Sequence, residues 1–245
     1  MIEIPNIKSI YFCGDIHGNL EYIKYTFNQA HLTNSIIFIC GDVGLGFSTK
    51  WEQSIIDHIN KKLVINNNYV IGVRGNHDDP SKFQDIELFK ENGKPRNWLN
   101  VPDYTVVRVL DQNVLCIGGG TSIDRTLRLK MGYGYWPDEG VKYQEKVPEK
   151  IDIICTHSAP SFCYPFTKGD IVTEYAKQDP NLLADLDIER RTLDKVYNDY
   201  KDDVKYWYYG HFHKSNTQTI GETVFKLLNI GEIWRHVFTV EDDNN

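Results

Sequence analysis

Residues 9–18 read Ser-Ile-Tyr-Phe-Cys-Gly-Asp-Ile-His-Gly, and this stretch gives the clearest indication of how the chain folds. Its mostly apolar first half predicts a β-strand over about 9–13, which runs into the polar loop 14–18. Asn19 can cap a helix after that loop. Apolar residues recur there at helical spacing, at Leu20, Ile23, Phe27 and Ala30. A strand, a polar loop and a helix in this order form the basic unit of α/β proteins.

A similar arrangement recurs twice in the following sixty residues. A strand over about 35–40 runs into the loop 41–46, and a second helical stripe follows at Trp51, Ile55, Ile56, Ile59 and Leu63. A third strand over 69–73 leads into the loop Arg74-Gly75-Asn76-His77-Asp78. These units predict an α/β fold that begins with a parallel sheet. Because ligands bind at the carboxyl ends of such strands, we expect a site where these loops meet.

The rest of the chain is less regular. Strands over 104–110 and 113–118 flank a predicted hairpin turn at 111–113, and a strand over 151–155 ends in Thr156-His157. The other predicted elements are a long loop over 121–150, a loop with short helical pieces over 158–184, a helix over 185–200, a strand over 205–209 that ends in Gly210-His211-Phe212-His213, and β-like segments over 216–220, 223–229 and 233–240.

The composition is typical of a globular protein. Of the 245 residues, 41% are hydrophobic and 25% are charged, which suits a single domain over 1–240 with a short acidic tail over 241–245. No apolar run approaches the roughly eighteen residues that a membrane span needs, and the N-terminus lacks the pattern of a signal peptide. The formal net charge of −7 disfavours long duplex nucleic acid as a partner.

Cysteine usage indicates a reducing compartment. Four of the five cysteines lie inside apolar, strand-like runs, where a small thiol packs without a partner. There is no C-x-x-C spacing, which disfavours a zinc ribbon or a redox pair. We therefore expect a cytoplasmic protein.

Residues that can bind metals follow five of the predicted strands. The set comprises Asp15, His17, Asp42, Asn76, His157, His211 and His213. Carboxylate oxygen, amide oxygen and imidazole nitrogen are ligands of hard and borderline divalent cations. Taken singly, an aspartate after a strand can cap a helix and an asparagine can favour a turn. Seven such residues at five strand ends instead predict a two-metal site, in which one bridging carboxylate would hold the ions about 3.5–4 Å apart.

The ordered motifs resemble those of the calcineurin-like metallophosphoesterases, and the segment 118–139 resembles small bacterial and phage members. The motifs span residues 13 to 213 and read Gly14-Asp15-Ile16-His17-Gly18, Gly41-Asp42, Gly75-Asn76-His77-Asp78, Thr156-His157 and Gly210-His211-Phe212-His213. The resemblance implies two central β-sheets packed together with helices outside. It also implies a hydrolase that acts on phosphoester bonds.

The resemblance further assigns roles to the metal-binding residues. It implies a first metal held by Asp15, His17 and His213, a second held by Asn76, His157 and His211, and a bridge formed by Asp42. A hydroxide shared by the two ions would be the nucleophile, its pKa lowered by their charge. Manganese is the expected metal, and iron and zinc also tolerate this ligand set.

Two neighbouring residues are candidate catalytic residues by the same resemblance. His77 matches the family's non-ligand histidine, which protonates the leaving oxygen or stabilises charge on the phosphoryl group. We expect Asp78 to orient the imidazole of His77.

The substrate-binding residues are less clearly marked. Serine/threonine protein phosphatases carry an Asp-Arg pair after the bridging aspartate, whereas the loop 41–46 has no arginine. Arg74 and Arg125 are the predicted phosphate contacts, with Arg128 as a further candidate, because arginine can bind phosphate oxygens in pairs. For Arg125, pairing with Asp124 or exposure to solvent is the alternative. The aromatic stretch 133–137 could stack on a nucleobase or pack on the core.

The sequence therefore predicts a two-metal hydrolase of phosphomonoesters or small phosphodiesters, nucleotides among them. A serine/threonine-type protein phosphatase is the alternative within this class. A binding scaffold that keeps the fold without catalysis is the alternative from another class, and it is disfavoured because no ligand of the set is missing. The oligomeric state is not indicated by the sequence.

Overall fold

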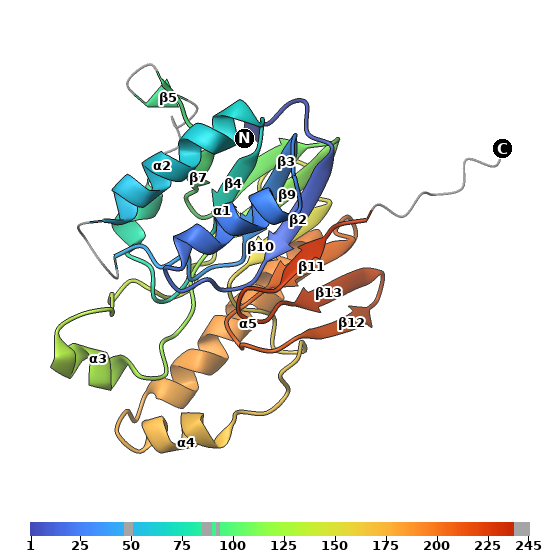
Figure 1. Ribbon diagram of the computed structural model, residues 1–245. Coiled ribbons are helices and arrows are strands. Elements are labelled where there is room, and N and C mark those ends of the chain that lie inside the picture. The colour runs from blue at the N-terminus through green and yellow to red at the C-terminus, as the bar shows by residue number, and fades with distance from the viewer. Residues whose placement is uncertain (47–50, 85–89, 92–93, 238–245) are drawn as a thin grey trace.

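The computed structural model describes residues 1–46, 51–84, 90–91 and 94–237, and two β-sheets pack face to face at its centre (Figure 1). The five-stranded sheet has the order β14-β2-β3-β4-β7. Its strands are β2 (Ser9–Cys13), β3 (Ser35–Ile39), β4 (Tyr69–Gly72), β7 (Trp98–Asn100) and β14 (Ile233–Arg235). The first four of these are parallel, and β14 pairs with β2 in the antiparallel direction. The predicted parallel start of the fold is confirmed.

The seven-stranded sheet is built mainly by the second half of the chain and has the order β1-β8-β9-β10-β11-β13-β12. Its strands are β1 (Ile2–Glu3), β8 (Thr105–Val109), β9 (Gln112–Ile117), β10 (Ile153–Thr156), β11 (Tyr206–Tyr209), β12 (Asn216–Ile220) and β13 (Thr223–Leu227). Parallel pairing of β9, β10 and β11 directs the ends of β10 and β11 to one edge of the sheet. A small separate ladder joins β5 (Lys90–Glu91) and β6 (Lys94–Pro95).

The longer helices cover the outer faces of the two sheets, whereas two short ones lie away from them (Figure 1). The helices are α1 (Leu20–Gln29), α2 (Glu52–Ile65), α3 (Arg125–Met131), α4 (Asp170–Ala176) and α5 (Leu182–Tyr200), with a short 3-10 helix over Pro80–Phe83. Apart from Ala30 and Trp51, which are exposed and flank the helices, the predicted stripes of α1 and α2 pack on the five-stranded sheet, and α5 packs on the seven-stranded sheet. The architecture is therefore the expected one of two central sheets with helices outside.

The core between the sheets fixes their relative position. Its residues come from both sheets, and the ring of Phe12 from β2 stacks on that of Tyr208 from β11 with 3.7 Å between ring centroids. Close-packed interiors transmit position rather than absorb displacement. The strand ends of the two sheets are consequently held in a fixed relation to each other.

Several predicted boundaries differ from the structure. The hairpin turn lies at Leu110 and Asp111, whose φ angles of 50° and 59° suit the two-residue type I′ turn that follows strand twist. The helix α3 lies inside the predicted loop 121–150, and none of its side chains is buried, so it leaves no apolar stripe in the sequence. The strands β1 and β7 were not predicted, and α5 begins three residues earlier than expected. The predicted tail 241–245 and the end of the predicted segment 233–240 lie outside the described residues.

Two further predictions concern membrane-spanning helices and the state of the cysteines. Within the described residues, none of the helices combines the length and apolar composition needed to cross a bilayer. All five cysteines are buried and free, and Cys40 Sγ lies 3.6 Å from Cys155 Sγ without forming a disulfide.

Candidate metal centre

The loops after β2, β3, β4, β10 and β11 meet at one edge of the two sheets and bring all seven predicted ligands together. Each ligand lies within five residues after the end of its strand. Four of them have positive φ angles between 44° and 67°, namely His17, Asp42, His211 and His213. Such angles are uncommon for residues other than glycine and concentrate at functional sites. The backbone is therefore bent sharply where these side chains are directed inward.

Two glycines in these loops leave room for a carboxylate. A Cβ atom placed on Gly75 would lie 2.0 Å from Asp42 Oδ1, and one on Gly210 would lie 2.0 Å from Asp15 Oδ1. No side chain larger than a hydrogen fits at either position. The motif glycines thus permit the close approach of backbone to the two buried aspartates.

A first group of three donors consists of Asp15, His17 and His213. His213 Nε2 lies 3.1 Å from Asp15 Oδ2 and 3.0 Å from His17 Nε2. Asp15 is fully buried, and its oxygens also accept hydrogen bonds from the backbone N–H of His211. Because the two imidazoles remain partly exposed, solvent can reach this side of the centre.

A second group lies deeper and includes Asp42, Asn76 and His157, all buried. His157 Nε2 is 2.8 Å from Asn76 Oδ1 and 3.4 Å from Asp42 Oδ1. The ring of His211 joins the group, with its Nδ1 3.1 Å from His157 Nε2. This group contains the three side chains that the family resemblance assigns to the second metal.

Asp42 lies between the two groups. Its Oδ2 is 3.5 Å from His17 Nδ1, and its Oδ1 is 3.4 Å from His157 Nε2 and accepts a hydrogen bond of 3.0 Å from the backbone N–H of His77. One carboxylate oxygen therefore faces each group. This is the placement that a bridging ligand requires.

The hydrogen-bonding capacity of the second group fits a bound cation. His157 Nδ1 lies 2.9 Å from the carbonyl oxygen of Cys40, which can only accept, so Nδ1 carries the hydrogen. In the neutral ring Nε2 then presents a lone pair toward Asn76 Oδ1 and Asp42 Oδ1. Acceptors that face one another in a buried site need a proton or a cation between them. Nitrogen and oxygen donors of this kind suit manganese, iron or zinc.

The electrostatics of the two aspartates lead to the same conclusion. Burial opposes the ionisation of Asp15, but His157 and a hydrogen bond from His213 lower its pKa to about 2. Burial raises the pKa of Asp42 to about 7, and the carboxylates of Asp15 and Asp78 add to the increase. Two buried carboxylates this close are both ionised only when positive charge compensates them. Burial opposes the protonation of His157, but Asp42 and Asp15 raise its pKa, so a protonated His157 can supply this charge, and a bound cation would supply it as well.

His77 lies beside the second group and faces α3. Its ring nitrogens are 3.3 and 3.4 Å from Asn76 Nδ2, and its Nε2 is 3.5 Å from Arg128 Nη2. Burial and the Arg128 guanidinium lower the pKa of His77 to about 3. Near neutral pH the ring is therefore uncharged and can donate a single N–H.

The structure gives Asp78 a different role from the expected orientation of His77. Its two carboxylate oxygens accept hydrogen bonds of 2.6 to 3.1 Å from backbone N–H groups, those of Val43, Gly44, Leu45 and Gly75. The carboxylate is buried and joins the loop after β3 to the loop after β4. Asp78 therefore shapes the backbone around Asp42, because loop amides rather than an imidazole occupy its acceptors.

Arg74 and Arg125, the predicted substrate contacts, have protein partners instead. Arg74 is buried and donates to Asp103 Oδ2 at 2.8 Å and to the carbonyl oxygen of Glu139 at 2.7 Å. Arg125 forms ion pairs with Asp179 and, at 2.6 Å, with Asp185. The alternative pairing of Arg125 with Asp124 is also not observed. Both guanidinium groups thus hold segments of the fold together.

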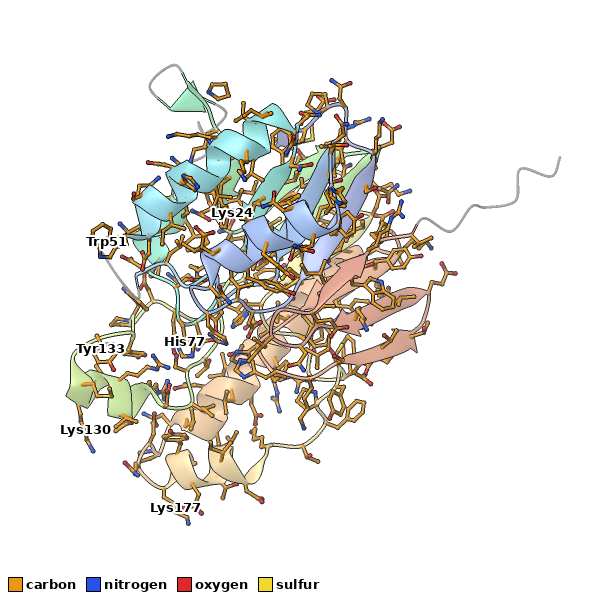
Figure 2. The ribbon with its side chains drawn as sticks, in the orientation of Figure 1. Lys24, Trp51, His77, Lys130, Tyr133 and Lys177 are labelled. Atoms are coloured by element: carbon orange, nitrogen blue, oxygen red, sulfur yellow. The ribbon has the colours of Figure 1, made fainter. Side chains whose placement is uncertain are left out.

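Arg128 is the arginine that the structure places next to the site. Its Nε donates to both carboxylate oxygens of Asp124 at 2.8 Å, and its Nη1 is 3.4 Å from the carbonyl oxygen of Gly134. The remaining nitrogen, Nη2, is directed at His77. In Figure 2, α3 lies beside His77, while Lys130 on the same helix points away from it.

Trp136 and Tyr133 of the aromatic stretch 133–137 lie in different surroundings. Trp136 packs against the loop after β3, since a Cβ atom on Gly46 would lie 2.8 Å from its ring. Tyr133 is 59% exposed, next to α3 (Figure 2). Trp136 therefore packs on a loop of the site rather than on the core, whereas the ring of Tyr133 is exposed.

Sequence reasoning missed two buried residues behind the centre, Ser122 and Glu139. Ser122 Oγ accepts a hydrogen bond of 2.8 Å from Asn76 Nδ2 and donates one of 2.7 Å to Glu139 Oε2. Both residues lie in the predicted loop 121–150. Neither has a sequence signal of its own, apart from the three glycines before Thr121 that mark an unusual turn.

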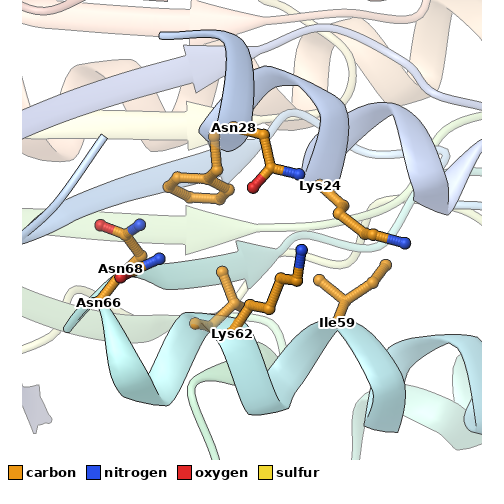
Figure 3. Close-up of a pocket in the computed structure, with 8 residues that line it drawn as sticks. Lys24, Asn28, Ile59, Lys62, Asn66 and Asn68 are labelled. Atoms are coloured by element: carbon orange, nitrogen blue, oxygen red, sulfur yellow. The ribbon is translucent and has the colours of Figure 1, made fainter. Parts of the chain in front are cut away.

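A pocket elsewhere on the molecule is unrelated to this centre. It lies between α1 and α2, and Figure 3 shows Lys24, Asn28, Ile59 and Lys62 around it. None of the predicted site residues lines it. Lys24 is already paired with Glu21 at 2.8 Å.

Comparisons with known proteins are consistent with this geometry. A family model described as Calcineurin-like phosphoesterase matches residues 8–215, which include every predicted ligand. A search of curated proteins found no significant match.

Several solved structures are similar to the chain. One is an uncharacterised protein from Streptococcus pneumoniae described as a predicted phosphoesterase, with 12% identity, a TM-score of 0.37, and coverage of 91% of this chain and 72% of the other. A second, from Staphylococcus aureus, is provisionally assigned as a 5'-nucleotidase, with 13% identity, a TM-score of 0.46, and coverage of 93% and 50%. A third is a phosphopantetheinyl hydrolase from Mycobacterium tuberculosis, with 13% identity, a TM-score of 0.39, and coverage of 92% and 90%.

Proposed function

Because this chain belongs to the calcineurin-like phosphoesterase family and is a hydrolase of phosphoester bonds, we propose that it hydrolyses phosphomonoesters or small phosphodiesters at a two-cation centre. We assign Asp15, His17 and His213 to one cation, Asn76, His157 and His211 to the other, and Asp42 to both. The observation that carries the proposal is the position of Asp42, with one carboxylate oxygen facing each group of donors.

The cations and the protein residues have separate tasks in this proposal. When bound, two divalent cations supply Lewis-acid charge and lower the pKa of water, which provides a nucleophile near neutral pH. The expected metal is Mn²⁺. The protein orients both cations from the rigid edges of two packed sheets, so little reorganisation accompanies the reaction.

His77 and Arg128 would act on the substrate itself. His77 is uncharged near neutral pH, so we assign it hydrogen-bond donation to the phosphoryl group or to the leaving oxygen rather than storage of a positive charge. Arg128 directs Nη2 toward the same space and would neutralise a phosphate oxygen. These two residues therefore replace Arg74 and Arg125 as the proposed substrate contacts, together with the cations.

The segment that carries Arg128 suggests which substrates to assay first. It carries the exposed ring of Tyr133 next to α3, and the carbonyl oxygen of Gly134 lies 3.4 Å from Arg128 Nη1 (Figure 2). An aromatic face beside a phosphate site can stack on a nucleobase, so nucleotides are the first substrates to assay. A panel of linear nucleotides, cyclic nucleotides and simple nitrophenyl esters with Mn²⁺ distinguishes monoester from diester preference.

The variant Asp42→Asn tests the proposed function. We expect kcat/KM for p-nitrophenyl phosphate and for its bis ester to fall by at least about 10³-fold, because a neutral amide cannot serve both cations. Asp111→Asn is the matched control, since it removes one carboxylate from an exposed hairpin turn where asparagine is favoured. Full activity of Asp42→Asn would refute the proposal.

A further inference from the structure

The amide of Asn76 fits its site in two orientations of almost the same shape, but only one of them presents oxygen to the second cation. In the structure Oδ1 is 2.8 Å from His157 Nε2, and Nδ2 is 2.8 Å from Ser122 Oγ. The reverse orientation would direct an NH₂ group, which cannot ligate a cation, toward His157. Some feature of the surroundings must therefore distinguish the two ends of the amide.

Ser122 makes this distinction, and its own polarity is set by Glu139. The hydroxyl of Ser122 donates its only hydrogen to Glu139 Oε2 at 2.7 Å, and the backbone N–H of Ser122 donates to Glu139 Oε1 at 2.7 Å. Above its pKa of about 8, Glu139 is ionised and can only accept. The Ser122 oxygen therefore has only lone pairs left for Asn76, and it must receive the NH₂ end of the amide.

Burial makes the arrangement selective. Asn76, Ser122 and Glu139 are each no more than 4% exposed, so water does not readily replace a mismatched hydrogen bond. A buried donor or acceptor left without a partner is disfavoured, so the orientation that satisfies both ends of the amide is preferred.

Glu139 is in turn held by its backbone. Its carbonyl oxygen accepts hydrogen bonds from Arg74 Nη1 at 2.7 Å and from the backbone N–H of Gly120 at 3.1 Å. Arg74 is itself paired with Asp103. The role of Arg74 is thus to support this chain of hydrogen bonds from behind rather than to bind phosphate.

We propose that Glu139 is a positioning residue that acts through Ser122 to keep the oxygen of Asn76 directed at the second cation. This inference rests on the proposed two-cation centre. Glu139 itself touches neither cation nor substrate. Its effect is to set which end of a buried amide serves as the ligand.

The variant Glu139→Gln reverses the chain of hydrogen bonds without changing its shape. The backbone N–H of Ser122 still needs an acceptor, so the glutamine oxygen stays there and its NH₂ group faces Ser122 Oγ. The serine hydroxyl must then donate to Asn76, which turns the amide and directs NH₂ at the cation. We expect isothermal titration with Mn²⁺ to show one site weakened at least 10-fold and the other unchanged.

The variant Asn76→Asp supplies the control, because a carboxylate has no NH₂ end. In the Asn76→Asp protein the hydroxyl of Ser122 should donate its hydrogen to the new carboxylate. The change Glu139→Gln permits this, because the hydroxyl then no longer has to donate to Glu139. The same Glu139→Gln change is therefore expected to leave Mn²⁺ affinity equal or higher in the Asn76→Asp protein. A general packing defect would instead lower the affinity in both backgrounds. Burial raises the pKa of Glu139 to about 8, so the titrations are made anaerobically at pH 8.5.

The outcomes separate this inference from the proposed function. If the unaltered protein binds no Mn²⁺, the two-cation centre is wrong. If the unaltered protein binds two Mn²⁺ ions and Glu139→Gln binds them equally well, or loses affinity in both backgrounds, the positioning role is overturned. Thermal unfolding without metal identifies a variant that does not fold, in which case Ser122→Ala tests the same contact and should weaken one site.

Discussion

The strand-end loops and the segment 118–140 both reach the candidate centre, yet they are built in opposite ways. The loops carry Asp15, Asp42 and His157, which are at most 1% exposed, on backbone fixed by two packed sheets. The segment 118–140 contains α3, in which no side chain is buried and Leu129 is 61% exposed. The cation ligands thus lie on loops fixed by the two packed sheets, whereas Arg128, one of the two proposed substrate contacts, lies on a peripheral helix.

This difference separates two requirements of such a site. Cation ligands must keep their geometry whichever ester is bound, so they benefit from close packing. A residue that contacts substrate can lie on an element held by a few polar interactions, because the contact forms only while substrate is bound. Arg125 provides such an interaction, since its ion pairs with Asp179 and Asp185 attach α3 to the region of α4 and α5. The two regions should therefore respond differently to substitution.

The largest expected effect is on stability and comes from the strand-end loops. Asp78→Asn replaces one acceptor oxygen with an NH₂ group that faces backbone N–H donors, so buried hydrogen bonds are lost. We expect the free energy of unfolding to fall by about 3 kcal/mol, measured by urea denaturation. Asp79→Asn is the matched control, because Asp79 caps a short 3-10 helix at the surface and should cost at most about 1 kcal/mol. Equal stability of Asp78→Asn and the unaltered protein would contradict the role given to Asp78.

The next effect is on catalysis and comes from α3. Arg128→Ala is expected to lower kcat/KM by about 10- to 100-fold, which corresponds to about 1.4–2.7 kcal/mol. Mn²⁺ affinity and thermal stability should change little, since Arg128 is not a ligand and α3 is peripheral. Lys130→Ala removes a cation from the same helix on the side that faces away from His77 (Figure 2) and should leave kcat/KM unchanged. Similar kinetics for the two variants would argue against a phosphate contact by Arg128.

The smallest effect is expected on stability, at the ion pairs of Arg125 that attach α3. Asp179→Asn removes one partner of Arg125, and a partly exposed ion pair of this kind contributes about 1 kcal/mol or less. The hydrogen bond from Arg125 lowers the pKa of Asp179, so between the folded and unfolded pKa values the unfolded chain binds more protons. The contribution is therefore present above the unfolded value near 3.8 and is lost as the pH falls below it. Urea denaturation of both proteins from pH 7 downward should show that the difference between their free energies of unfolding becomes smaller as the pH falls. A difference that becomes larger would contradict a stabilising ion pair between Arg125 and Asp179.

The fold was largely predictable because its strands and main helices carry strong periodic signals. The buried stripe of α1 and the fully buried strand β3 follow directly from apolar spacing. The helix α3 and the strand β7 could not be predicted from apolar spacing, because α3 buries no side chain and β7 contains only three residues. Short or peripheral elements leave little pattern in a sequence.

The sequence predicted those residues of the candidate site that directly follow a predicted strand. Asp15 and His211 could be located because each directly follows a glycine at a strand end, a position where polar side chains gather. The roles of Asp78, Arg74 and Arg125 could not be predicted. Each depends on a partner far away in the chain, such as Asp103 for Arg74 and Asp179 for Arg125.

The sequence by itself determined the order of strands and polar loops, and therefore the chemical nature of the donors at the edge of the sheets. Only the tertiary structure decided which arginine faces His77 and which end of the Asn76 amide faces His157. The physical reason is that apolar periodicity is a local property of the chain. The direction of a hydrogen bond or ion pair depends instead on groups that come together only when the two sheets pack.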